Sequence, residues 1–236
     1  MFLTNIANPP LFAYIRTVKT RYILILLFTL TLSGLLSAQT LGGLDSRTDA
    51  MMRDWRRDRP AVGVDSWLRF APVAFDLTAG ALGLDARRDF VGRGIEAAIA
   101  FGAMAAMTEG LKVSVRSVRP DGTDDRSFPS GHAAVAFTGA ELVRMEYGWG
   151  WGAGAYAVAT SVAALRLYNG RHWLSDVLAG AGLGILSAHI GDWLTDPVQR
   201  FLGLDPSRTT FSVTPVSVPG SIHTDFTFAA GFSYTF

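Results

Sequence analysis

Long apolar stretches separated by short polar breaks constrain the fold of this chain more than any other feature. The stretches lie at residues 66–84, 94–111, 131–147, 148–165 and 174–194. Each is much longer than a typical β-strand of about five or six residues, and each is rich in Ala and Gly. Small residues let helices approach one another closely. The pattern therefore predicts an all-α helical bundle over residues 66–203.

The same stretches leave open whether the helices cross a membrane. Only residues 147–165 combine freedom from charge with nearly the length, about 20 residues, that a spanning helix needs. The other stretches carry charged side chains, so a compact water-soluble bundle is the alternative. If the chain starts outside the cytoplasm, the loop with Arg87 and Arg88 lies inside, as the positive-inside rule expects. Residues 112–132 and 166–173 then share the outer side.

Residues 1–38 have the composition of a signal peptide. A basic region precedes an uncharged apolar run, residues 22–38, which ends in small residues. An uncleaved membrane anchor is the alternative, and in either case the following chain begins outside the cytoplasm. Residues 39–65 are rich in charge, and we expect them to form a surface segment without catalytic residues.

The C-terminal segment, residues 204–236, differs in pattern from the rest of the chain. Aromatic residues alternate with small or polar ones from Phe226 to Phe236, which is the period of a β-strand with one apolar face. Residues 209–218 could pair with this strand. We therefore expect a short β-hairpin that packs on the helical domain or on a partner.

Charged and polar residues gather in three short segments between the apolar stretches. The first runs from Lys112 to Arg119-Pro120, and Lys112 is the only lysine after residue 38. Lysine carries a compact charge and arginine a rigid fork, so one of each suits a phosphate with several oxygens. A basic loop at a helix end is the alternative.

The second segment is Pro129-Ser130-Gly131-His132, which opens into an apolar run. Pro129 and Ser130 are typical of a helix start, and Gly131 lets a ligand approach the backbone closely. Free N–H groups at a helix start bind anions, most often phosphate. His132 would then lie beside the anion, unless the segment is only an ordinary helix start.

The third segment contains Arg166, His172 and Asp176. His172 and Asp176 are four residues apart, which places both side chains on one face of a helix. A carboxylate that holds one imidazole nitrogen leaves the other free to attack or to accept a proton. A surface ion pair is the alternative, although few polar residues follow in this helix.

Composition excludes several other kinds of function. The chain has no cysteine, which rules out disulfides and thiolate chemistry, and its net charge of +1 shows no nucleic-acid-binding surface. His132, His172 and Asp176 could supply three zinc ligands, but the nearby arginines would repel the cation. We therefore expect neither a metal nor another cofactor.

Together, the three segments resemble the signature of the type 2 phosphatidic acid phosphatase superfamily, which includes bacterial non-specific acid phosphatases and vanadium haloperoxidases. The resemblance covers roughly residues 66–195 and implies the helical-bundle fold of that family. In the third motif, Leu165 stands where the family usually has Ser. The matching residues are Lys112 and Arg119-Pro120, then Pro129 to His132, then Arg166, His172 and Asp176.

The resemblance also implies roles for these residues. His172 would be the nucleophile that forms a phosphohistidine, Asp176 would orient it, and His132 would be the general acid for the leaving group. Three cations and a helix N-terminus can stabilise a transferring phosphoryl group without a metal. The residues that would hold the phosphoryl oxygens are Lys112, Arg119, Ser130, Gly131 and Arg166.

We therefore predict a phosphatase of the bacterial cell envelope that hydrolyses a phosphomonoester or a pyrophosphate, most naturally of a lipid. It would be associated with the inner membrane or lie in the periplasm, with its active site on the periplasmic side. A soluble periplasmic non-specific acid phosphatase is the first alternative. A vanadium-dependent haloperoxidase is a further alternative, but the chain is short for that group. A non-catalytic envelope protein is another, and the nearly complete set of catalytic motifs argues against it.

Overall fold

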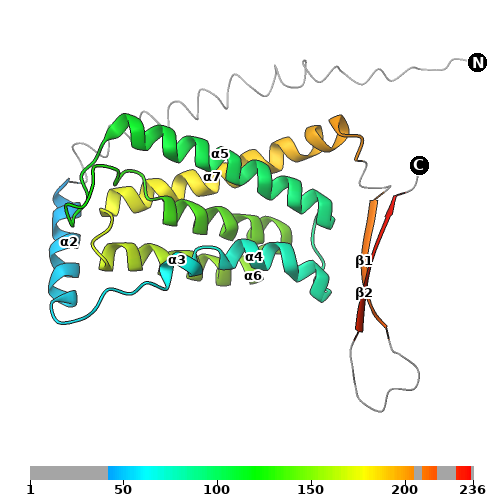
Figure 1. The fold of residues 1–236 in the computed structure, drawn as a ribbon, viewed down its shortest axis with the longest axis horizontal. Coiled ribbons are helices and arrows are strands. Elements are labelled where there is room, and N and C mark those ends of the chain that lie inside the picture. The colour runs from blue at the N-terminus through cyan, green and yellow to red at the C-terminus, as the bar shows by residue number, and fades with distance from the viewer. Residues whose placement is uncertain (1–41, 205–208, 217–226, 235–236) are drawn as a thin grey trace, which may run out of the picture. The chain divides into compact units, whose positions relative to one another are not determined.

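A computed structural model of the chain describes residues 42–204, 209–216 and 227–234, and the expected signal peptide at residues 1–38 lies outside them. The expected all-α bundle is confirmed (Figure 1). Its helices are α2 (Gly42–Arg56), α3 (Asp65–Leu68), α4 (Ala71–Ala79), the 3-10 helix η1 (Gly80–Leu82), α5 (Phe90–Val115), α6 (Gly131–Tyr168) and α7 (Leu174–Phe201).

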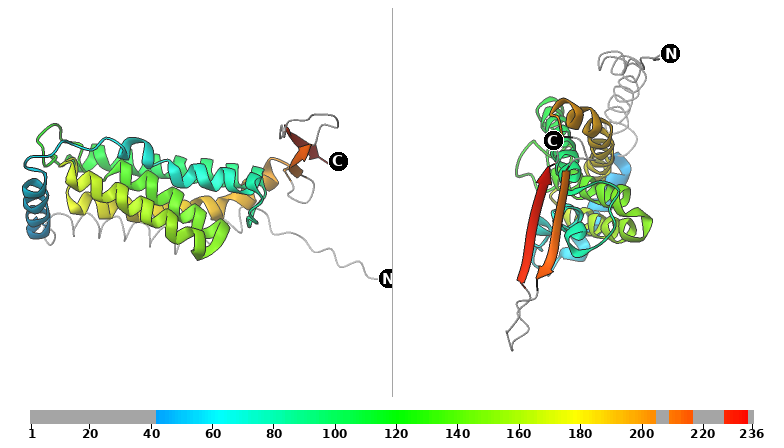
Figure 2. Two further views of the ribbon diagram at one scale, coloured as in Figure 1. Left: turned by 90° about the horizontal axis from the view of Figure 1, so that it is seen from below. Right: turned by 90° about the vertical axis from the view of Figure 1, so that its right-hand side faces the viewer.

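The three long helices form the centre of the bundle. α7 packs along both α5 and α6, and α4 packs on α6, as the views in Figures 1 and 2 agree. Small side chains such as Ala97, Ala100 and Ala188 surround Leu142 in the core. A Cβ added at Gly184 would lie 2.5 Å from the carbonyl oxygen of Ala134, so α7 and α6 approach at backbone distance. This close packing follows from the high content of Ala and Gly.

The apolar stretches do not all become separate helices. The stretches at 131–147 and 148–165 form one element, α6, in which Gly148 departs from helical geometry with a φ of 77°. Glycine adopts such a positive φ without steric cost, so the helix can kink there without ending in a loop. The stretch at 66–84 instead divides into α3, α4 and η1.

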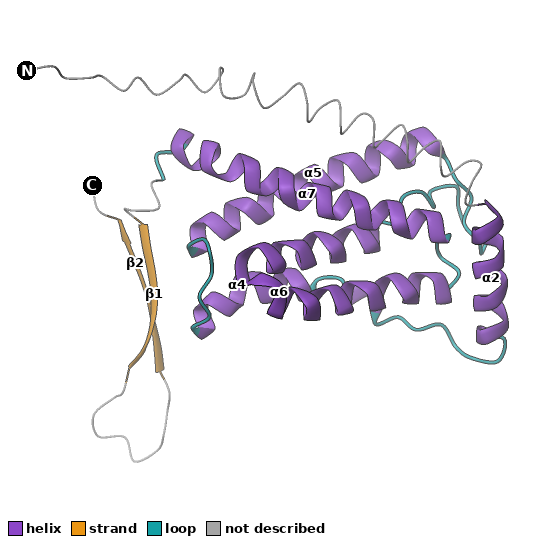
Figure 3. Cartoon of the chain, turned by 180° about the vertical axis from the view of Figure 1, so that it is seen from behind, coloured by secondary structure: helices purple, strands orange, loops and turns teal. Residues whose placement is uncertain are grey.

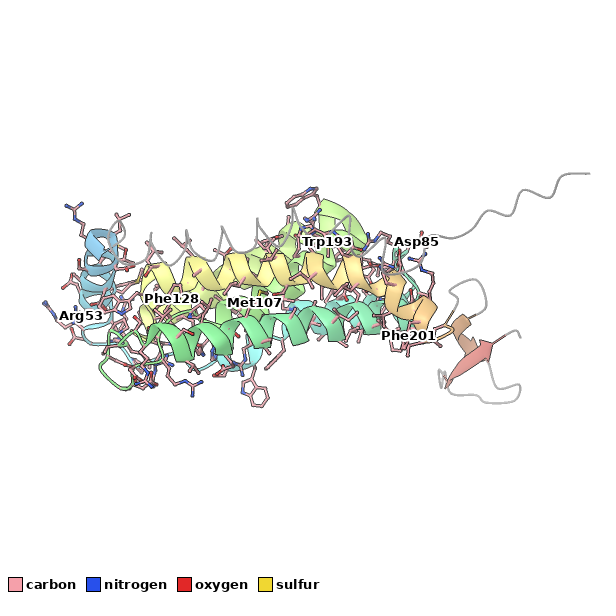
Figure 4. All side chains as sticks on the ribbon, turned by 90° about the horizontal axis from the view of Figure 1, so that it is seen from above. Arg53, Asp85, Met107, Phe128, Trp193 and Phe201 are labelled. Carbon is pink, nitrogen blue, oxygen red and sulfur yellow. The ribbon has the colours of Figure 1, made fainter. Side chains whose placement is uncertain are left out.

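The two ends of the bundle carry different polar groups. Phe128, directly before the second polar segment, lies at the end near α2, and Asp85 lies at the opposite end (Figure 4). Beside Asp85, Arg88 Nη2 lies 2.8 Å from Asp192 Oδ1, and Arg87 Nη2 lies 3.3 Å from Glu146 Oε1. These ion pairs tie the loop before α5 to α6 and α7.

The C-terminal segment contains two strands, drawn in orange in Figure 3. β1 (Thr209–Val216) pairs antiparallel with β2 (Thr227–Tyr234), with Thr209 opposite Tyr234. The contact of this segment with the helical domain or a partner stays a prediction.

Candidate active site

The three polar segments meet at one pocket of about 320 Å³. Two of the eight expected site residues, Ser130 and Asp176, are buried and lie outside its lining. The other six line it, namely Lys112, Arg119, Gly131, His132, Arg166 and His172. The lining residues that the sequence did not single out are Arg69, Met104, Ala105, Thr108, Glu109 and Val135.

His172 is presented to this pocket by the loop before α7, and it is only 3% exposed. Its Nδ1–H donates a hydrogen bond to the carbonyl oxygen of Ser127 at 2.8 Å, while Nε2 lies 3.3 Å from Nη1 of Arg119. Burial, together with the charges of Arg166 and Arg119, lowers the pKa of His172. The imidazole is therefore neutral near pH 7, and Nε2 keeps the lone pair that a nucleophile needs.

Asp176 supports His172 less directly than the sequence pattern predicts. Its Oδ2 lies 3.7 Å from Nδ1 of His172, beyond hydrogen-bond distance, and accepts hydrogen bonds from Ser127 Oγ and from the backbone N–H of Trp173. Because Asp176 lies in the first turn of α7, its carboxylate caps a free N–H of the helix start. Asp176 thus holds Ser127, and the carbonyl of Ser127 holds His172.

Arg166 is held by a carboxylate that no motif contains. Its Nη1 lies 2.6 Å from Oδ2 of Asp65, a residue of α3 that is 1% exposed. An ion pair this well buried fixes the direction of a guanidinium more firmly than an exposed one. Asp65 is therefore a positioning residue, 101 positions earlier in the chain than Arg166, and sequence spacing gave no signal for it.

We expect Asp65→Ala to lower kcat/KM for the phosphatase reaction that the sequence predicts by about 10- to 100-fold, because Arg166 then loses its orientation in the pocket. Asp65→Asn should restore most of the activity, since the amide oxygen can still accept from Nη1. The measurement is steady-state kinetics of both variants, together with their melting temperatures. Equal losses in the two variants, or no loss in either, would exclude a positioning role.

The first turns of α6 line one side of the site. Ser130 is the N-cap, and its own N–H donates to the carbonyl oxygen of Asp176 at 2.9 Å. A Cβ added at Gly131 would lie 3.5 Å from Nζ of Lys112, so the ammonium group lies beside the free N–H groups of this helix end. A lysine and a helix N-terminus together form an anion-binding site.

Arg119 connects the first segment to the third. Its Nε donates to Asp124 Oδ1 at 2.7 Å, and its Nη1 donates to the carbonyl oxygen of Arg171 at 2.9 Å. The same Nη1 lies next to Nε2 of His172. The guanidinium is thus fixed beside Nε2 of His172, where it can contact an anion that enters the pocket.

His132 lies in the first turn of α6, against an arginine outside the motifs. Nη1 of Arg69 lies 3.3 Å from Nδ1 and 3.2 Å from Nε2 of His132. Burial is the main cause that lowers the pKa of His132 to about 3, followed by the charges of Arg166 and Arg69. His132 is therefore neutral at pH 7 until an anion offsets these charges.

The charged segment before the first apolar stretch makes hydrogen bonds to the third polar segment. Asp45 of α2 accepts hydrogen bonds from the N–H and the Oγ of Ser175, at 2.9 and 2.7 Å. The backbone of Val62 exchanges two hydrogen bonds with the side chain of Asn169, at 3.0 and 2.8 Å. This segment was expected to form only a surface, but its residues Asp45 and Val62 thus hold the two ends of the loop that carries His172.

Comparison with known proteins points to one family. A family model of the PAP2 superfamily matches residues 94–196. The lipid A 1-phosphatase of Porphyromonas gingivalis is 35% identical over 155 residues, which are 64% of this chain and 34% of that protein. The chain therefore spans about a third of the length of this curated relative.

Two solved structures are similar to this one. The transmembrane PAP2-type phosphatidylglycerolphosphate phosphatase of Bacillus subtilis gives a TM-score of 0.50 at 21% identity, covering 76% of this chain and 98% of that chain. LpxE of Aquifex aeolicus gives a TM-score of 0.46 at 22% identity, covering 61% and 93%. The first of these similarities shows the shared helical fold.

Proposed function

We propose that this chain, whose residues 94–196 match the PAP2 superfamily model, is a lipid phosphatase that works through a phosphohistidine at His172. One observation carries the proposal: Nε2 of a neutral His172 faces a pocket lined by Lys112, Arg119 and Arg166. A nucleophile surrounded by fixed cations is the arrangement that phosphoryl transfer needs, since that reaction depends mainly on positioning and on charge stabilisation.

In the first step, Nε2 of His172 attacks phosphorus. A bond from nitrogen to phosphorus forms as the bond from phosphorus to the leaving oxygen breaks. The three cations stabilise the charge on the phosphoryl oxygens, and His132 donates a proton to the leaving oxygen. The Nδ1–H of His172 stays on the carbonyl of Ser127, which stabilises the positive charge that develops on the ring.

In the second step, water attacks the phosphohistidine. His132, now without its proton, takes one from the water, the bond from nitrogen to phosphorus breaks, and inorganic phosphate leaves. Both histidines return to their starting states. Each step uses only side chains and backbone groups of this chain, because the cations and the start of α6 supply the positive charge.

Substrate binding prepares His132 for its role as an acid. In the free site its low pKa reflects burial and the charges of Arg166 and Arg69. A bound phosphate dianion offsets those charges and raises the pKa of His132, so the proton is taken up with the substrate. The acid is then charged only when a phosphate is in place.

Apolar side chains near the pocket support a lipid substrate. Trp67, which is 80% exposed, precedes Arg69 by two positions, and Val113, 66% exposed, follows Lys112 directly. Helices α5 and α7 are also long and apolar enough to cross a membrane, although core helices of soluble proteins pass the same test. These features fit a site that receives its substrate from a lipid surface.

The proposal places the active site on the periplasmic side of the cell envelope. Arg87 lies two positions from Asp85, at the end of the bundle opposite Phe128 (Figure 4). Basic loops of membrane proteins prefer the cytoplasmic side. The pocket at the other end would then face outward.

A substrate panel tests the proposal. Phosphate release would be measured in detergent and EDTA from phosphatidate, an isoprenoid pyrophosphate and a soluble aryl phosphate. We expect at least about tenfold higher kcat/KM for a lipid substrate, since its acyl or prenyl chain adds apolar binding energy. Activity confined to the aryl phosphate and independent of detergent would reject the lipid substrate, and activity lost in EDTA would reject the metal-free mechanism.

A further inference from the structure

Arg69 is a cation of the pocket that belongs to none of the three motifs. It follows α3 directly and lines the pocket. One guanidinium nitrogen lies within 3.3 Å of both ring nitrogens of His132, so it rests against the ring and not along a single lone pair. The same guanidinium lies 4.6 Å from the ring centroid of Phe70.

The charge of Arg69 differs from the other pocket cations in having no carboxylate beside it. Lys112, Arg119 and Arg166 each have an acidic partner, at 3.7, 2.7 and 2.6 Å. Within the described part of the chain, no carboxylate contacts Arg69, and its Nε is buried without a hydrogen-bond partner. A partly buried charge without a counter-ion is unfavourable, so this guanidinium is open to an anion that enters the pocket.

The chemistry of the reaction places Arg69 on the side of the leaving group. In an in-line displacement, the leaving oxygen lies opposite the attacking atom, which here is Nε2 of His172. His132 is the acid for that oxygen, and Arg69 contacts His132. The three oxygens of the transferred phosphoryl group already have Lys112 and two arginines to match them. Arg69 is therefore a fourth cation, and it lies on the leaving-group side of the bond that breaks, opposite His172.

We propose that Arg69 binds an anionic group on the leaving side, so that the site prefers a diphosphate ester to the monophosphate ester of the same lipid. This inference rests on the proposed phosphatase function. His172 would form a bond to the terminal phosphorus as the bond from that phosphorus to the bridging oxygen breaks. The electron pair stays on the bridging oxygen of the departing monophosphate, where Arg69 offsets the charge, and water then releases inorganic phosphate from His172.

The contact between Arg69 and His132 agrees with this preference. An alkoxide leaving group needs a proton from an acid, whereas a phosphate leaving group departs as an anion that an arginine can stabilise. Arg69, which contacts His132, can stabilise the second kind of leaving group by its charge alone, without a proton transfer from His132.

The test compares farnesyl diphosphate with farnesyl monophosphate, using the full chain in detergent micelles. Arg69→Met should lower kcat/KM for the diphosphate by about 30- to 100-fold and for the monophosphate by no more than about fivefold, because a hydrogen bond to a charged group is lost only with the diphosphate. The kcat/KM of Arg69→Lys for the diphosphate should lie between those of Arg69→Met and the wild type. Arg116→Met, which removes an exposed charge outside the pocket, should leave both values unchanged.

A second measurement needs no variant. Inorganic pyrophosphate should inhibit the wild type at least about ten times more strongly than inorganic phosphate, since only pyrophosphate reaches both sides of the breaking bond. Equal losses on the two substrates, no loss on either, or equal inhibition by the two anions would overturn the role of Arg69. A wild type that releases phosphate from neither substrate would instead refute the phosphatase function itself.

Discussion

Replacing His172 by Ala is expected to lower kcat/KM for the best lipid phosphate by about 10⁴-fold or more, because the reaction then has no nucleophile. The variant removes the proposed attacking atom, Nε2 of His172, which lies beside Arg119 in the pocket while Nδ1–H donates to Ser127. Phosphate release under steady-state conditions measures the effect. The melting temperature should change little, because a smaller side chain leaves the hydrogen bonds of Ser127 and Asp176 intact.

A matched control comes from a histidine outside the site. His189 of α7 pairs with Glu141 at 2.9 Å and does not line the pocket. His189→Ala should therefore keep activity within about threefold of the wild type, as expected for a residue without contact to the reacting atoms. A His172→Ala variant that retains a tenth of the activity or more would show that another group attacks phosphorus.

Arg119→Met should produce the second largest loss, with kcat lowered by about 10²- to 10³-fold. Its Nη1 lies 3.3 Å from Nε2 of His172, the proposed attacking atom, so it is placed to stabilise the charge that would develop on the phosphoryl oxygens. Two further hydrogen bonds, to Asp124 and to the carbonyl of Arg171, hold the guanidinium in this position before the substrate arrives. Such preorganisation makes its charge more effective than that of a mobile side chain.

Two variants separate this role from a general effect of charge. Arg119→Lys keeps the charge but loses the fork, so it should recover only part of the rate. Arg171→Met removes a half-exposed guanidinium that pairs with Asp121 at 3.1 Å, and it should leave kcat nearly unchanged. If Arg119→Met raised KM while kcat stayed at the wild-type value, Arg119 would bind the substrate and the transition state equally.

Much of the fold and the site could be predicted because the relevant signals are local in sequence. The long Ala- and Gly-rich stretches predicted helices, and α5, α6 and α7 contain four of the five. Each polar segment contained its own candidate site residues at short spacing, as with Ser130 and His132 at the start of α6. The family resemblance then implied that the segments meet, and the pocket contains residues from all three.

The residues that were missed depend on contacts between distant parts of the chain. Asp65 ends the charged segment and Arg69 stands in the first apolar stretch, and nothing in their spacing links them to Arg166 or His132. The role of Asp176 was also simplified, because spacing predicts which side chains share a helix face but not that the carboxylate turns to Trp173 and Ser127. Only tertiary packing decides such competition between hydrogen-bond partners.

The covalent intermediate is the most direct test of the proposed chemistry. The full chain would be mixed with a lipid diphosphate labelled in its terminal phosphate, with EDTA present, quenched in alkali during turnover, and digested to locate the label. We predict a label on His172 that is stable to alkali and lost in acid, appears and disappears with turnover, and is absent from His172→Ala. Turnover in EDTA without any label on His172, or a label on another residue, would contradict catalysis through a phosphohistidine at this position.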